Sequence, residues 1–267
     1  MTKNYAAHVF SLCALFVLSS VMTNYSFDSL LDVAVAFGLI FLSTVLINLT
    51  QNKTGVFLVL NLVILLSAIG GAIVAFLNFF TFVKSVLLPQ SSHVFILVAS
   101  ILIVFIILKS RSEALLKYSL LTAVICGVVI AVCFILSIKN FDFSDFTNSY
   151  SKKISWGEVI TIFSFVSLPF FVKDKSPNSK PILLGSFTGF LLAAVCYLQS
   201  VFVLGKTDDI TLSYLRAVSA ISTGSLFTRL DGLVYFLFFV TFIIKIAVCA
   251  KVVLKSAISC FKNTIAT

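Results

Sequence analysis

The sequence predicts an all-α protein, a polytopic bundle of transmembrane helices. Of its 267 residues, 60% are hydrophobic and only 11% are charged, and the mean hydropathy is +1.15. A soluble domain would carry charged side chains at about a quarter of its positions. The apolar residues also gather in runs of about 20, the length of helix that crosses a hydrocarbon core about 30 Å thick.

Eight apolar runs fit that length. They cover residues 6–23, 30–49, 55–83, 93–109, 115–138, 157–173, 181–204 and 231–254. The connections between the runs are short, so residues 1–267 are expected to form a single membrane domain. The first run is interpreted as a retained span, because no small-residue cleavage pattern follows it.

The distribution of lysine and arginine predicts that both termini lie in the cytoplasm, since inner loops carry an excess of these residues. With the N-terminus inside, the inner set is Lys3, Lys53, Lys109, Arg111, Lys117, Lys173, Lys175, Lys180, Lys251, Lys255 and Lys262. The smaller outer set is Lys84, Lys139, Lys152, Lys153, Lys206, Arg216 and Arg229. The basic residues form no stripe, so the net charge of +9 is interpreted as topology rather than as nucleic-acid binding.

The third run is the longest. It has no charge from Thr54 to Val83, which as a helix measures about 45 Å and predicts tilt or projection beyond the bilayer. Near its middle, Ser67 and Gly71 stand four residues apart, as do Ala68 and Ala72. Small residues at this spacing predict that another helix packs closely there.

The sixth run, "GEVITIFSFVSLPFFVK", is the shortest and is expected to be interrupted. Ser164 and Ser167 precede Pro169, which lacks a backbone N–H and can open the helix and free the carbonyls of Ser164 and Phe165. Short, interrupted helices line the substrate site of many transporters. The alternative is an ordinary proline kink whose carbonyls are satisfied by the two serines.

Lys245 lies inside the last apolar run, about 9 Å deeper than Lys251 at about 1.5 Å per residue. A charge at that depth is costly unless it faces a polar cavity or snorkels to the interface. Two interpretations stay open: a functional cation inside the bundle, or a snorkelling lysine. Asn61 in the third run is a further polar candidate, with a hydrogen bond across helices as its alternative. Asp32 is expected to be a first-turn acid.

Motifs for soluble or intramembrane enzymes are not found. The chain has no phosphate-binding loop, no GxSxG, no HExxH and no paired carboxylates at membrane depth. Its six cysteines form no CxxC and no cluster with the two histidines, so they are interpreted as small buried hydrophobic residues. We therefore expect no catalytic activity, no metal and no cofactor.

Three stretches resemble the spore-germination permeases, the GerAB-type B subunits of nutrient germinant receptors, within the amino acid/polyamine/organocation transporter superfamily. They are "LLPQSSHVFILVASILIVFIILKSRSEALLKYS", "SWGEVITIFSFVSLPFFVKDK" and "YLRAVSAISTGSLFTRLDGLVYFLFFVTFIIKIAVCAK". The last combines an outer amphipathic segment, an Arg-Leu-Asp entry and a span that contains Lys245. Asp231 is expected to cap the helix that begins at Gly232, and Arg229 to lie at the outer interface.

The resemblance implies a LeuT-like fold, a five-plus-five inverted repeat that holds its substrate between the first and sixth spans. It implies a sensor of a small, amino-acid-like nutrient, with the receptor's A and C subunits as partners and the spore inner membrane as location. The expected binding residues are Ser164, Phe165 and Ser167, with Asn61 and Lys245.

The sequence departs from the family pattern in two ways. Eight runs are present where the family has ten spans, so the fold is expected to be a truncated form of the repeat. The first run contains no Gly or Pro to open it, and an opened first helix would supply backbone groups for a substrate carboxylate. Two alternatives therefore stay open: an amino acid transporter of the same superfamily, and a non-transporting subunit that only assembles partners.

Overall fold

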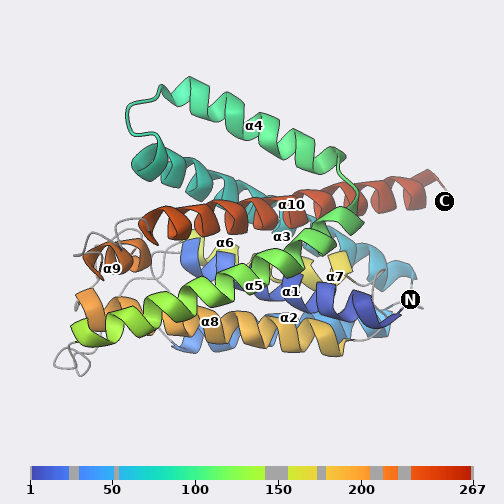
Figure 1. The fold of residues 1–267 in the computed structure, drawn as a ribbon. Helices are drawn as coiled ribbons and strands as arrows, with labels where there is room; N and C mark the ends of the chain where they lie inside the picture. Colours follow the sequence, from blue (N-terminus) through green and yellow to red (C-terminus); the bar gives the residue numbers. More distant parts are fainter. Residues whose placement is uncertain are drawn as a thin grey trace.

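A computed structural model describes residues 2–23, 30–50, 54–141, 156–172, 179–204, 213–221 and 230–265. Nearly all of these residues are helical (Figure 1). The helices are α1 (Thr2–Thr23), α2 (Leu30–Thr50), α3 (Thr54–Phe82), α4 (His93–Lys109), α5 (Ser112–Ser137), α6 (Trp156–Ser164), α7 (Ser167–Val172), α8 (Lys180–Leu204), α9 (Ser213–Ile221) and α10 (Leu230–Ile265). A π-helical turn, Val83–Leu87, extends α3, and a 3-10 turn, Ile138–Asn140, extends α5.

Each predicted run coincides with a helix or, for the sixth run, with the pair α6 and α7. Among the described residues, four helices are long and apolar enough to cross a membrane, within Val59–Leu87, Ser112–Asn140, Lys180–Leu204 and Gly232–Ser259. The other four runs contain shorter apolar helices. The all-α membrane class is therefore confirmed, while the number of spans stays a prediction.

The start of α10 differs from the prediction. Helix α10 begins at Leu230, so Asp231 stands in its first turn and does not precede the helix as a cap. Arg229 lies outside the described residues. The predicted outer amphipathic segment is present as α9, a short helix whose Tyr214, Leu215 and Val218 are buried.

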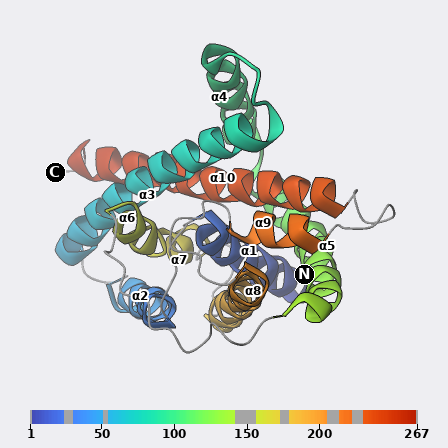
Figure 2. The same ribbon diagram turned by 90° about the vertical axis from the view of Figure 1, so that its left-hand side faces the viewer.

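Helix α1 occupies the centre of the bundle (Figure 2). Every residue from Ser11 to Ser19 is buried, on all sides of the helix, because α5, α8 and α10 pack around it. Its tightest neighbour is α8. A Cβ on Gly185 would lie 2.3 Å from the carbonyl oxygen of Phe10, and one on Gly189 would lie 2.5 Å from that of Ala14. The GxxxG spacing of α8 thus lets the two backbones touch.

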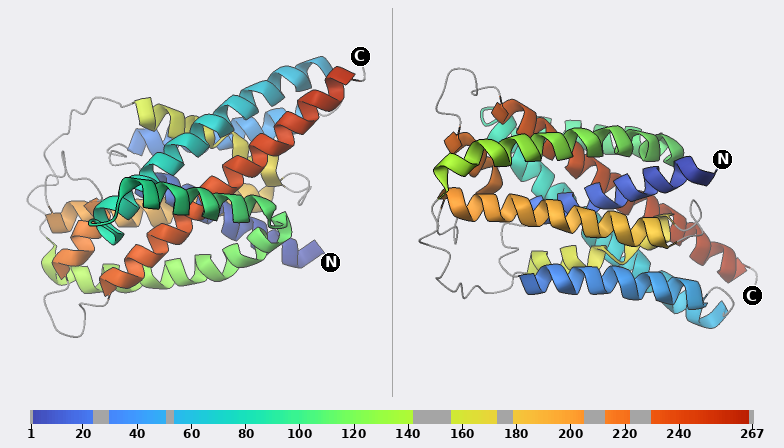
Figure 3. Two further views of the ribbon diagram at one scale, coloured as in Figure 1. Left: turned by 90° about the horizontal axis from the view of Figure 1, so that it is seen from above. Right: turned by 60° about the horizontal axis from the view of Figure 1, so that its bottom comes forward.

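Helices α3 and α10 form the second framework of the bundle and lie side by side in antiparallel directions (Figure 3). Near one end, Asn61 of α3 bonds the backbone of Ser256. Near the other, the ring of Phe82 stacks on those of Phe238 and Phe242, with centroids 5.8 and 5.6 Å apart. These two contacts, one near each end, set how α10 is aligned along α3.

Helix α4 stands apart from the other helices and touches mainly α10 and α3 (Figure 1). Its exposed side chains are nearly all apolar, including Val94 at 72%, Phe95 at 62% and Ile106 at 65% exposed. Apolar surface of this extent is unfavourable in water and neutral in lipid. This arrangement agrees with a chain embedded in a membrane.

Both termini lie at one end of the bundle, where α7 also ends (Figure 1). Described members of the predicted inner basic set meet at this end. The Nζ of Lys251 donates to the backbone oxygen of Ser110, and the Nζ of Lys255 donates to that of Phe170 over 3.2 Å. The shared end agrees with the prediction that the termini lie on the same side of the membrane.

Candidate functional site

The sixth predicted span is interrupted, as expected from Pro169. Helix α6 ends at Ser164, two residues form a turn, and α7 begins at Ser167. Pro169 is the third residue of α7, a first-turn position where a helix does not need its N–H. Pro169 has no N–H to donate to the carbonyl oxygen of Phe165, one turn earlier. The series of backbone hydrogen bonds along the helix is therefore broken at that point.

The carbonyls expected to be free are bonded within the segment. The hydroxyl of Ser167 donates to the oxygen of Ser164 at 2.6 Å, and the N–H of Leu168 donates to the oxygen of Phe165 at 3.2 Å. The hydroxyl of Ser164 donates to Thr161 in the same way, at 2.6 Å. The two serines therefore satisfy the break, and each hydroxyl keeps lone pairs that can accept a further hydrogen bond.

Lys245 is the one fully buried lysine or arginine side chain among the residues whose exposure the structure describes, and 0% of it is exposed. Its Nζ has no hydrogen-bond partner in the described part of the chain. The side chain therefore does not reach an interface, and the snorkelling interpretation is wrong. The physical reason is that α10 packs against several helices, among them α1, α3 and α7.

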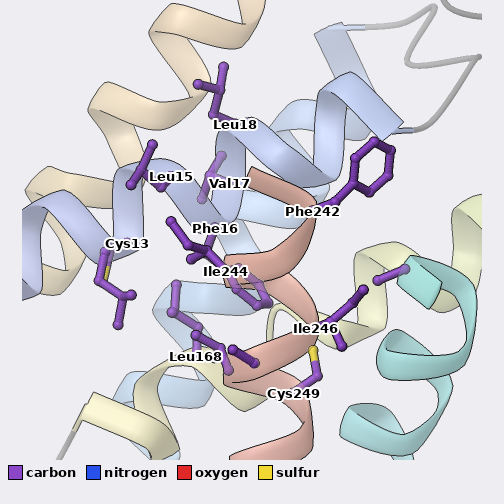
Figure 4. Close-up of a cluster of buried hydrophobic side chains, with 14 of the residues drawn as sticks. Cys13, Leu15, Phe16, Val17, Leu18, Leu168, Phe242, Ile244, Ile246 and Cys249 are labelled. Atoms are coloured by element: carbon purple, nitrogen blue, oxygen red, sulfur yellow. The ribbon is translucent and has the colours of Figure 1, made fainter. Parts of the chain in front are cut away.

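The side of α10 that carries Lys245 faces the break. Cys249 follows Lys245 by four residues, one helical turn, so the two residues lie on the same side of α10. The hydroxyl of Ser167 lies within hydrogen-bonding reach of the Cys249 thiol. Side chains of α1, α7 and α10, among them Phe16, Leu168 and Cys249, meet in one buried cluster (Figure 4).

Helix α3 closes the other side of this region. A Cβ on Gly71 would lie 2.4 Å from the Cβ of Ser164 and 3.4 Å from the Sγ of Cys249. The small-residue face predicted for α3 is therefore confirmed at Gly71, and the helix it admits is α6. Together, Ser164, Ser167, Lys245 and Cys249 form a buried polar cluster around the break, which we call the break site.

The other predicted binding residues lie outside the break site. The ring of Phe165 packs against Phe16 of α1 and Phe190 of α8, with centroids 5.8 Å away in both cases. Asn61 bonds Ser256 at 3.2 Å, 11 residues and about 16 Å along α10 from Lys245 at about 1.5 Å per residue. Its cross-helix bond is the alternative that the sequence left open. Asp32 lies in α2, but its side chain is outside the described part.

Two buried polar residues of α8 were not singled out by the sequence. Gln199 is 0% exposed and neither polar atom of its amide has a partner in the described part of the chain. Ser186 is also 0% exposed, with an unpartnered hydroxyl among the described residues. A glutamine inside an apolar run was the available signal, because polar residues at membrane depth are often functional.

The break site combines one cation, hydroxyl acceptors and a thiol in apolar surroundings. This combination can bind a small polar molecule that carries negative charge. The described residues contain no group of three or more His, Cys, Asp or Glu side chains able to hold a metal.

Comparison with known proteins gives no relative for this chain. No protein-family model matches it, and no curated protein or solved structure is significantly similar to it.

Proposed function

We propose that the chain is a permease-like membrane subunit of a spore germinant receptor, which binds a small amino-acid-like nutrient at the break site. The observation that carries the proposal is the position of Lys245, buried and unpartnered among the described residues, beside an interrupted helix. Buried charges in membrane helices face partners or ligands far more often than they are idle. The proposed partners are the receptor's A and C subunits, in the cell membrane or spore inner membrane.

The directions of four helices support the proposed inverted repeat. Helix α1 starts at the end of the bundle where α7 ends (Figure 1). Helix α1 and the pair α6–α7 therefore run in opposite directions. Helices α3 and α10, the third long elements of the two proposed halves, are also antiparallel. Opposite directions of corresponding helices are required by an inverted repeat, and also occur in any bundle whose successive spans alternate in direction.

Helix α1 favours binding over transport within this proposal. It is continuous from Thr2 to Thr23 and is buried on all sides from Ser11 to Ser19. Alternating access in such folds commonly uses two interrupted helices that face each other. Since α6–α7 is the one span interrupted in the described part of the chain, the chain is better suited to sensing a ligand than to passing it through the membrane.

The first test is ligand binding to the purified chain in detergent, measured as thermal stabilisation by the common amino acids. A ligand that binds the folded state must raise the melting temperature. Ser164→Leu places a bulky side chain against Gly71 and should abolish the shift. Thr122→Leu, on the exposed face of α5, is the matched control and should keep it. Absence of stabilisation by every amino acid would favour the subunit that only assembles partners.

The second test separates a sensor from a transporter. Proteoliposomes that contain the chain are loaded with buffer and exposed to the stabilising amino acid in labelled form. We expect binding without accumulation inside the vesicles. Accumulation that needs an intact break site would establish an amino acid transporter of the same superfamily instead. In spores, Ser164→Leu and Lys245→Leu should each shift the nutrient dose response, and copurification with A and C subunits would test the receptor assignment.

A further inference from the structure

The charge of Lys245 has no counter-charge in the described helices. Their acidic residues are Asp32, Glu113, Glu158 and Asp231, and each stands within the first three residues of its helix. Lys245 follows Asp231 by 14 residues, about 21 Å along α10 at about 1.5 Å per residue. Its Nζ has no hydrogen-bond partner in the described part of the chain. Within the described part of the chain, the break site therefore holds a buried lysine with no paired carboxylate.

We propose that Lys245 binds the carboxylate of the ligand, so that the break site accepts amino acids and simple monocarboxylates and rejects amines that lack a carboxylate. This inference rests on the proposed binding function and narrows it to one ligand class. It excludes polyamines and other organic cations, because a second positive charge beside Lys245 would be repelled in a site of low dielectric constant.

The rest of the break site supports the same ligand orientation. Helix α1 is continuous, so it presents no opened helix end whose N–H groups could hold a carboxylate. The hydroxyls of Ser164 and Ser167 already donate to backbone oxygens, and therefore face a ligand as acceptors. Acceptors suit the ammonium group of an amino acid. A zwitterion thus places its carboxylate on α10 and its ammonium group on the α6–α7 turn.

In the structure the break site is closed to solvent. Lys245 is 0% exposed and Ser164 and Ser167 are also 0% exposed, so a ligand enters only when α6–α7 and α10 separate. The contact that must open is the one between Ser167 and Cys249. The turn at Phe165–Val166 supplies the flexible point, because its hydrogen bonds span three residues in place of four.

The test compares matched ligands on the purified full chain by thermal shift. Each common amino acid is measured beside its carboxamide, with propionate and ethylamine as the simplest acid and amine. We expect at least one amino acid to raise the melting temperature by about 5 to 10 °C at about 100 times its dissociation constant. Its carboxamide and ethylamine should give no shift at the same concentration.

Three variants assign the effect to the lysine. Lys245→Met removes the charge but keeps an apolar side chain of similar length, and should weaken amino acid binding at least about 30-fold. Lys245→Arg keeps a cation and should retain part of the affinity. Lys251→Met, which removes a lysine one and a half turns further along α10, should bind as the parent chain does. Size-exclusion profiles identify any variant that fails to fold.

Specific outcomes would overturn the inference. Equal stabilisation by an amino acid and its carboxamide, or unchanged binding by folded Lys245→Met, would remove the carboxylate contact while binding itself stands. The chain can also be compared in chloride and methanesulfonate buffers. A higher melting temperature in chloride would assign the site to an inorganic anion, if Lys245→Met abolishes the difference and amino acids do not reduce it. If no amino acid, carboxylate or amine stabilises the parent chain, both this inference and the proposed function fail.

Discussion

Gly71 of α3 and Ser164 of α6 are in such close contact that a side chain at position 71 would force one of the two helices to shift. A Cβ added to Gly71 would lie 2.4 Å from the Cβ of Ser164, and one added to Gly70 would lie 2.9 Å from the Cγ2 of Ile160. Helix α6 therefore ends directly against the glycine pair of α3. This contact sets the position of the break, and with it the position of both serines relative to Lys245.

Gly71→Ala is expected to lower the stability of the chain by about 1 to 3 kcal/mol, because the added methyl group must push α6 away from α3. The measurement is the midpoint of thermal unfolding in detergent. Gly38→Ala is the matched control, since nothing lies within 4 Å of a Cβ at that position. Equal stability of the two variants would show that α6 does not approach α3 as described.

Gly189→Ala is expected to separate α1 from α8. The new Cβ would lie 2.5 Å from the backbone oxygen of Ala14 and 2.8 Å from the Cβ of Val17, and a backbone cannot move aside as a flexible side chain can. We expect a loss of about 1 to 3 kcal/mol. Gly127→Ala in α5 has open space and should be neutral in the same assay. A neutral Gly189→Ala would contradict the α1–α8 packing.

Pro169→Ala is expected to stabilise the chain and to weaken ligand binding. Alanine restores an N–H that can donate to Phe165, so α6 and α7 can join into one helix, with a gain of up to about 3 kcal/mol. A continuous helix would lose the turn on which the break site depends. Both effects can be read from thermal melts with and without amino acid. Pro181→Ala, at the second residue of α8, should change neither quantity.

Gln199→Leu distinguishes a structural amide from a functional one. Its buried amide has no partner among the described residues, so replacement by an apolar side chain of similar size is expected to raise stability by about 1 to 3 kcal/mol. Gln90→Leu, in the exposed turn after α3, is the control and should not raise it. Loss of stability in Gln199→Leu would indicate that the amide has a partner outside the described residues.

Much of the local structure could be predicted from the sequence. The apolar runs predicted the helices to within a few residues, because a membrane helix must satisfy its backbone within itself. The exception is α10, which continues to Ile265, 11 residues beyond the predicted run. Pro169 predicted the interruption, and the small residues near Gly71 predicted a close helix contact. Asp231 was predicted to precede the helix but lies in its first turn, because local residues determine where a helix starts only to within one or two positions.

The candidate site was predicted less completely. Ser164, Ser167 and Lys245 were named from a proline and from a charge inside apolar runs, and the structure places all three around one break. Phe165 lies in the turn itself, but its ring packs on Phe16 and Phe190, and Asn61 bonds Ser256 further along α10. Local sequence does not determine which neighbour a side chain meets, so these contacts could not be predicted.

The sequence by itself determined the membrane class, the helical segments and the interruption at Pro169, because these follow from local composition and backbone chemistry. Only the tertiary structure decided which helices are central. Helices α1 and α4 are both strongly apolar, yet α1 is buried on all sides and α4 is largely exposed. Lipid tails are as apolar as a protein core, so hydrophobicity cannot tell the two surroundings apart. The glycine contacts of α3 and α8 select the packing, and that packing places Lys245 beside the break.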